Sequence, residues 1–88
     1  MNITMNDAAT IAARSNTKIY DGYSGRGMYG EQCVGFTVEG RNYASLTAAI
    51  VRSLDDDVAD AMLGRLTTDS LGLGTIVYFP GFTIAKEV

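Results

Sequence analysis

The chain has 88 residues and a formal net charge of −3, with no histidine and a single cysteine, Cys33. This length allows one domain, and one cysteine excludes a disulfide framework or a cysteine-based zinc site within one chain. The missing histidine removes the commonest metal ligand and general base. The acidic balance argues against direct binding of nucleic acid, because that affinity comes mainly from Lys and Arg on phosphates.

The N-terminal residues predict a strand or tail over Met1 to Met5, followed by a short helix over the segment NDAATIAARSN. Asn6 is the expected N-cap, Asp7 suits the first turn, and the alanines favour helix. We expect the helix to end near Ser15-Asn16. The segment lacks the basic start and apolar run of a signal peptide, and no stretch approaches the roughly 20 apolar residues of a membrane span. We therefore expect a cytoplasmic protein.

Two strands with a long glycine-rich connection come next. The segments TKIYDGY and EQCVGFTVEG have the mixed apolar and polar pattern of half-buried strands, and we expect them to pair antiparallel. The connection, within YDGYSGRGMYG (Tyr20 to Gly30), holds four glycines and three tyrosines around Arg26. It is longer than a two-residue hairpin turn, and long connections often carry function.

The second half predicts two helices and a strand. A turn is expected at residues 39–42, followed by a brief return strand that would include Tyr43. Ser45 is the expected N-cap of a helix that ends at Leu54. Ser53 or Asp55 would cap a second helix, which TTDS (67–70) would end. Residues 75–79 are rich in β-branched and aromatic types and predict a strand, followed by a turn at Pro80-Gly81 and an edge segment, FTIAKEV. The positions expected to be buried on the helices are Leu46, Ala49, Ile50, Leu54, Val58, Met62, Leu63 and Leu66.

These elements predict a single α+β domain spanning residues 1–88. It would have a small, mainly antiparallel sheet with two to three helices packed on one face.

Three groups of residues are candidates for function. The glycine-rich loop, with its edges, offers Tyr23, Ser24, Arg26, Met28, Tyr29 and Glu31. It could contact a protein, or hold an anion through backbone N–H groups and Arg26. It could also simply connect two strands, with Tyr23, Met28 and Tyr29 folded onto the core.

The second candidate group is an acidic cluster of Asp55, Asp56, Asp57 and Asp60. Carboxylates at a helix N-terminus are favoured by the helix dipole, and an acidic patch also suits a basic partner. The third candidate, Cys33, has no histidine to activate it, so we interpret it as a small core residue rather than a nucleophile.

Two stretches, YSGRGMYGEQCVGF (Tyr23 to Phe36) and LGLGTIVYFP (Leu71 to Pro80), resemble small uncharacterised bacteriophage accessory proteins. Those proteins share a YSGRGMYG-type motif, a strand bearing a cysteine and an aromatic strand before proline. The resemblance implies a phage accessory protein that acts in the host cytoplasm. Many phage proteins of this size interfere with host machinery, among them anti-CRISPR and other anti-defence proteins. The resemblance assigns no role to any residue.

We therefore expect a non-enzymatic protein, without cofactor or metal, that binds and inhibits a host defence protein. One such target would be a nucleic-acid-binding defence complex, and we expect this protein itself to make no direct contact with nucleic acid or membrane. One alternative is a sponge for a nucleotide signal, with Arg26 on phosphate. Another is a phage structural or assembly component. Apolar surface left by so small a sheet makes a homodimer plausible.

Overall fold

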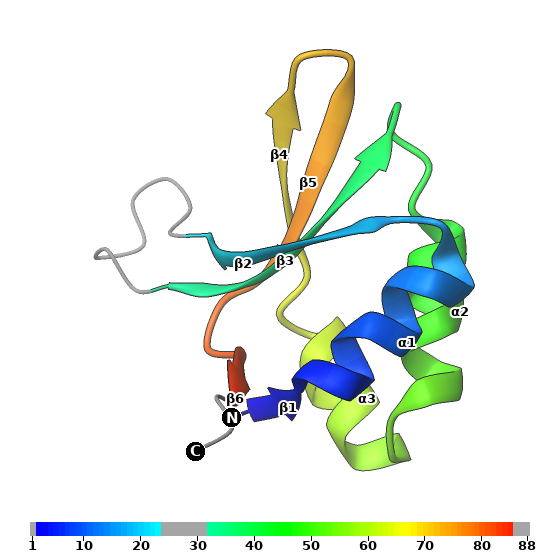
Figure 1. Cartoon of the computed structure of the whole chain (residues 1–88), viewed down its shortest axis with the longest axis vertical. Coiled ribbons are helices and arrows are strands. Elements are labelled where there is room, and N and C mark those ends of the chain that lie inside the picture. Colours follow the sequence, from blue (N-terminus) through cyan, green and yellow to red (C-terminus); the bar gives the residue numbers. More distant parts are fainter. Residues whose placement is uncertain (1, 24–31, 86–88) are drawn as a thin grey trace.

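The fold was obtained as a computed structural model, which describes residues 2–23 and 32–85 apart from the side chains of Asp21 and Leu71. The described residues form three helices and six strands (Figure 1), which confirms the predicted α+β class. In chain order the elements are β1 (Asn2–Thr4), α1 (Met5–Ser15), β2 (Lys18–Tyr23), β3 (Cys33–Glu39), α2 (Ala44–Ser53), α3 (Asp56–Leu63), β4 (Thr67–Leu71), β5 (Gly74–Phe79) and β6 (Thr83–Ala85).

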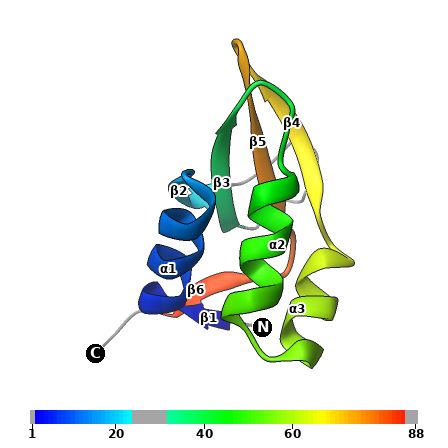
Figure 2. The ribbon, with the colours of Figure 1, turned by 90° about the vertical axis from the view of Figure 1, so that its right-hand side faces the viewer.

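A four-stranded antiparallel sheet with the order β2-β3-β5-β4 forms one layer, and the helices cover one of its faces (Figures 1 and 2). Side chains alternate along a strand, so β3 sends Val34, Phe36 and Val38 towards the helices. On β5, Val77 and Phe79 do the same. The helices and the C-terminal segment complete the core with Ile11, Leu46, Ile50, Met62 and Phe82.

The beginning of the chain is tied to its end. β1 pairs in parallel with β6, with Ile3 opposite Ile84, so the predicted strand or tail is a strand. The N-cap of α1 is Thr4 rather than Asn6. Its Oγ1 accepts the Asp7 N–H at 3.0 Å, while Asp7 Oδ2 accepts the Thr4 N–H at 3.4 Å. This reciprocal capping box satisfies two backbone donors, which a cap at Asn6 would leave without these acceptors.

The middle helices begin differently from the prediction. Tyr43 is the N-cap of α2 and not part of a return strand, and Asn42 Oδ1 accepts the Ala44 N–H at 3.2 Å, so Ser45 is not the cap. The chain is extended at Leu54, which separates α2 from α3 as predicted. Asp55 is the N-cap of α3, one of the two predicted positions, but its side chain makes no capping hydrogen bond, and the expected Ser53–Asp56 capping box is absent.

The segment expected to end the second helix is instead a strand. Residues 67–71 form β4 and pair antiparallel with β5, with Thr68 opposite Val77 and Ser70 opposite Thr75. Edge strands tolerate polar residues on solvent-exposed positions, which explains why TTDS lacks the apolar pattern of a strand. The turn at Pro80-Gly81 is confirmed, with Gly81 at φ 87°.

One long side chain connects two helices. Arg14 Nη1 donates to the Arg52 carbonyl oxygen at 3.1 Å and to Ser53 Oγ at 3.2 Å. A cation at the C-terminal end of a helix is favoured by the helix dipole, so Arg14 stabilises the end of α2 from α1. Among the described residues, none of the helices is both long and apolar enough to cross a membrane.

Candidate functional site

The face of the sheet that points away from the helices carries the candidate site. Cys33, Ile76 and Tyr78 form a small buried cluster there, separate from the main core, and Tyr23 packs against it. We call this surface the open face. It includes the end of β2 and the start of β3, which residues 24–32 join in the sequence.

An irregularity in β2 brings two tyrosines to the open face. Tyr20 pairs with Gly35 and Tyr23 pairs with Cys33, so two residues of β2 stand opposite the single residue Val34. In a regular strand, residues three apart point to opposite faces. The extra residue of this β-bulge restores Tyr23 to the same face as Tyr20. Gly22 has φ 76°, a left-handed backbone angle that glycine adopts without steric cost.

Three tyrosines from two strands form a continuous row across the open face, which we call the tyrosine row. The rings of Tyr20 and Tyr23 meet edge to face, with centroids 5.4 Å apart and an interplanar angle of 87°. The rings of Tyr23 and Tyr78 are 4.8 Å apart. Tyr20 is 44% exposed, while Tyr78 is 5% exposed. The tyrosine row therefore begins at the buried ring of Tyr78 and ends at the solvent-exposed ring of Tyr20.

Gly35 on β3 leaves room in the middle of the open face. A Cβ at this position would lie 3.5 Å from both Ile76 and Tyr78, at ordinary packing distance. A side chain longer than alanine would therefore occupy the space beside the tyrosine row. Glycine in a strand interior often marks a close approach of this kind.

A hydrogen bond fixes the central tyrosine. Tyr23 Oη donates to Asp69 Oδ2 at 2.6 Å, from β2 to β4 at the opposite edge of the sheet. Asp69 Oδ1 accepts the Ser70 backbone N–H at 2.9 Å. A short bond to a carboxylate is stronger than one between neutral groups. The ring of Tyr23 is thus held in one orientation before any partner arrives.

Cys33 supports the open face from below. It is 4% exposed, and its Sγ–H donates to the Tyr23 carbonyl oxygen at 3.1 Å. Burial raises the pKa of the Cys33 thiol from its ordinary value of 9.0, although a backbone hydrogen bond with Phe79 acts in the opposite direction. A thiol with a raised pKa carries little nucleophilic thiolate at neutral pH. This environment suits the packing role that we expected for Cys33.

The predicted site residues are found in three places. Tyr23 lies on the open face, half-buried against the sheet. Ser24, Arg26, Met28, Tyr29 and Glu31 lie outside the described residues. Asp55, Asp56, Asp57 and Asp60 are exposed at and beyond the start of α3, within the layer that covers the other face of the sheet. The structure therefore does not bring the acidic cluster together with Tyr23.

Tyr78 and Asp69 are candidate residues that the sequence analysis did not select. The Asp21-Gly22 pair inside a strand pattern is the feature that could have indicated the bulge. Asp69 was not selected because its segment, TTDS (67–70), was predicted to end a helix. Within residues 2–23 and 32–85, no group of three His, Cys, Asp or Glu side chains could hold a metal ion.

Comparisons with protein-family models, with curated proteins and with solved structures give no match to this chain. The fold and the open face define a small α+β domain that presents a preordered aromatic surface.

Proposed function

We propose that the protein is a non-enzymatic binding domain that docks onto a partner protein through the open face of its sheet. The observation that carries the proposal is the tyrosine row, in which the exposed Tyr20 packs against Tyr23, and Tyr23 packs against the buried Tyr78. Tyrosine supplies a large contact area at low cost in conformational entropy, and it is enriched among the residues that dominate binding energy at protein interfaces.

The rigidity of the row supports a docking role. Both of its strands belong to the central sheet, and the Tyr23–Asp69 hydrogen bond ties β2 to β4. Side chains ordered before binding lose less freedom on association, so more of the contact energy appears as affinity. The resemblance of the segments around Tyr23 and Tyr78 to bacteriophage accessory proteins adds that the partner is a host defence protein, which this domain would inhibit.

The first test compares two single substitutions in the full chain. We expect Tyr20→Ala to weaken binding to the partner at least about tenfold, because loss of a hot-spot tyrosine costs about 2 kcal/mol. Val51→Ala is the matched control, since Val51 is 50% exposed on α2, in the helical layer. The measurement is the amount of partner retained from a bacterial lysate by each immobilised variant, followed by affinity measurement with the purified partner.

The outcome depends on the difference between the two variants. Tyr20→Phe, which keeps the ring, should bind much as the wild type does. Equal loss in Tyr20→Ala and Val51→Ala, with both variants folded by circular dichroism, would contradict a docking surface on the open face.

The nucleotide sponge, the homodimer and the phage structural component also remain predictions. The nucleotide sponge depends on Arg26, which lies outside the described residues. The homodimer and the larger assembly of a structural component differ in mass from a monomer. Native mass spectrometry of the purified chain separates these states, and it also reports any retained nucleotide.

A further inference from the structure

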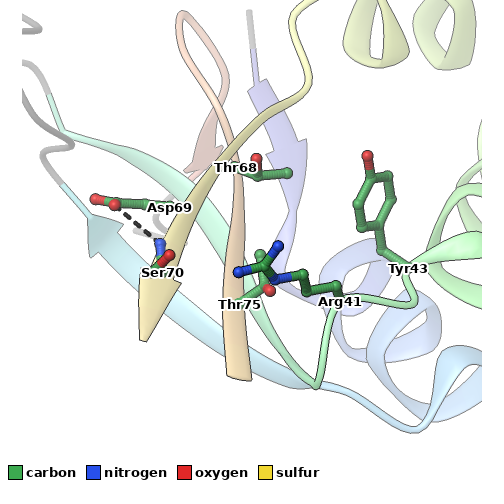
Figure 3. A pocket seen from close by; sticks show the side chains of 6 residues that line it. All are labelled: Arg41, Tyr43, Thr68, Asp69, Ser70 and Thr75. Carbon is green, nitrogen blue, oxygen red and sulfur yellow. Dashed lines mark hydrogen bonds between the residues drawn. The ribbon is translucent and has the colours of Figure 1, made fainter. Parts of the chain in front are cut away.

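An open cavity of about 440 Å³ lies between the β4–β5 hairpin and the connection from β3 to α2 (Figure 3). Its volume falls within the range of small-molecule sites in proteins. We call it the Arg41 cavity. The residues that line it are Arg41, Tyr43, Thr68, Asp69, Ser70 and Thr75.

The cavity has a fixed geometry because its two walls are joined. The Thr75 hydroxyl, on β5, donates to the Gly40 carbonyl oxygen at 2.6 Å and holds the β3–α2 connection against the sheet. Ser70 on β4 pairs with Thr75 on β5, and Thr68 lies two residues before Ser70 on the same strand. Residues two apart share a face, so both hydroxyls lie on the same side of the sheet as Thr75, where Arg41 and Tyr43 are held.

The cavity is lined by hydrogen-bond donors that the protein itself does not use. Among the described residues, the Arg41 guanidinium and the hydroxyls of Tyr43, Thr68 and Ser70 have no hydrogen-bond or ion-pair partner. A guanidinium presents five N–H donors in a fixed fork, and each hydroxyl presents one. Arg41, Thr68 and Ser70 are exposed, so their donors are free to bind solvent or an anion.

Neither of the neighbouring carboxylates, Asp69 and Glu39, forms an ion pair with Arg41. Asp69 borders the cavity, but its oxygens accept from Tyr23 Oη and from the Ser70 N–H. Figure 3 shows its side chain pointing away from Arg41. Glu39 pairs with Gly74 and shares the alternation of Cys33 and Gly35, so it belongs to the open face. Among the described residues, Arg41 therefore makes no ion pair, and its guanidinium is free to bind an anion in the cavity.

We propose that the Arg41 cavity is a binding site for a small organic anion, held through a phosphate or carboxylate group. Arg41 would clamp two oxygens of that group in the bidentate manner typical of guanidinium. The hydroxyls of Thr68 and Ser70 on β4 would donate to the remaining oxygens, and Tyr43 would border the rest of the ligand. This site lies on the other side of the sheet from the open face, with Asp69 bordering both, and it does not depend on the docking function proposed above.

The test is a titration of the isotopically labelled full chain, followed by two-dimensional NMR of its backbone amides. The probes are inorganic phosphate, ribose 5-phosphate and citrate, each added at constant ionic strength. We expect at least one probe to cause saturable shifts at the amides of Arg41, Thr68 and Ser70. A stronger response to the phosphates or to citrate identifies the group that the cavity prefers.

Two charge-matched variants decide whether the site is specific. Arg41→Gln should weaken the probe that binds at least about tenfold, because it removes the charge-assisted hydrogen bonds. Arg52→Gln removes the same charge from an exposed position of α2 and should leave the affinity unchanged. Equal weakening in the two variants, or shifts that rise linearly without saturation for all three probes, would overturn the proposal.

Discussion

At the scale of single residues, Cys33 shows how burial replaces reactivity with packing. The thiol lies under the tyrosine row and donates to the Tyr23 carbonyl oxygen. Desolvation disfavours the thiolate, which is why the pKa of Cys33 is raised. The single cysteine therefore contributes to the support of the open face and not to chemistry on it.

This burial predicts a dependence of stability on pH. The folded thiol keeps its proton at pH values where the unfolded chain has lost it, so Cys33 contributes stability that is fully present below its ordinary pKa of 9.0. That contribution is lost as pH rises through the raised pKa of the folded state. Urea unfolding across this pH range should show a steeper loss for the wild type than for Cys33→Ala. Parallel curves for the two proteins would show that the thiol titrates alike in both states.

At the scale of elements, the bulge in β2 is the feature on which the open face depends. Tyr20 and Tyr23 are three residues apart, and a regular strand would put one of them into the helical layer. The bulge places both on the open face, and Gly22 at φ 76° makes this backbone path inexpensive.

Substitution of Gly22 tests the bulge directly. Gly22→Ala should destabilise the protein by about 1 kcal/mol, because a Cβ is unfavourable in the left-handed region. Gly22→Asn should cost less, since asparagine tolerates that region better than alanine. The free energy of unfolding in urea measures both, and contacts between the rings of Tyr20 and Tyr23 in NMR report whether the bulge survives. If alanine is as stable as glycine at this position, the backbone path of β2 differs from the one described.

Much of the element pattern could be predicted from the sequence because it rests on local periodicity. Leu46, Ala49 and Ile50 recur at helical spacing and are buried in α2, and Thr75 to Phe79 are buried in β5. β4 was missed because its polar residues, Thr67 to Ser70, are stabilised by pairing with β5 and not by their own pattern.

The candidate site was less accessible to sequence analysis. The pattern drew attention to Tyr23 within the glycine-rich connection, but Tyr20 and Tyr78 come together with it only through strand pairing. The Tyr23–Asp69 bond joins residues 46 positions apart in the chain. No local feature encodes such a contact. The same holds for the Arg41 cavity, whose walls come from the β3–α2 connection and the β4–β5 hairpin.

At the scale of the whole molecule, the two layers have different surfaces. The helical layer carries the exposed carboxylates of α3, whereas the open face presents the tyrosine row. A domain of 88 residues has a thin margin of stability. In so small a domain, an exposed tyrosine row held in one conformation does little for the stability of the fold. Binding to a partner would explain why it is there.

The measurement that tests this account most directly is site-specific photo-crosslinking of the full chain in bacterial cells. A photoreactive phenylalanine analogue is placed at position 20 on the open face in one sample and at position 51 on α2 in another. We predict a discrete protein adduct from position 20 that is absent from position 51. An adduct from position 51 with none from position 20 would contradict the account and move the contact surface to the helical layer.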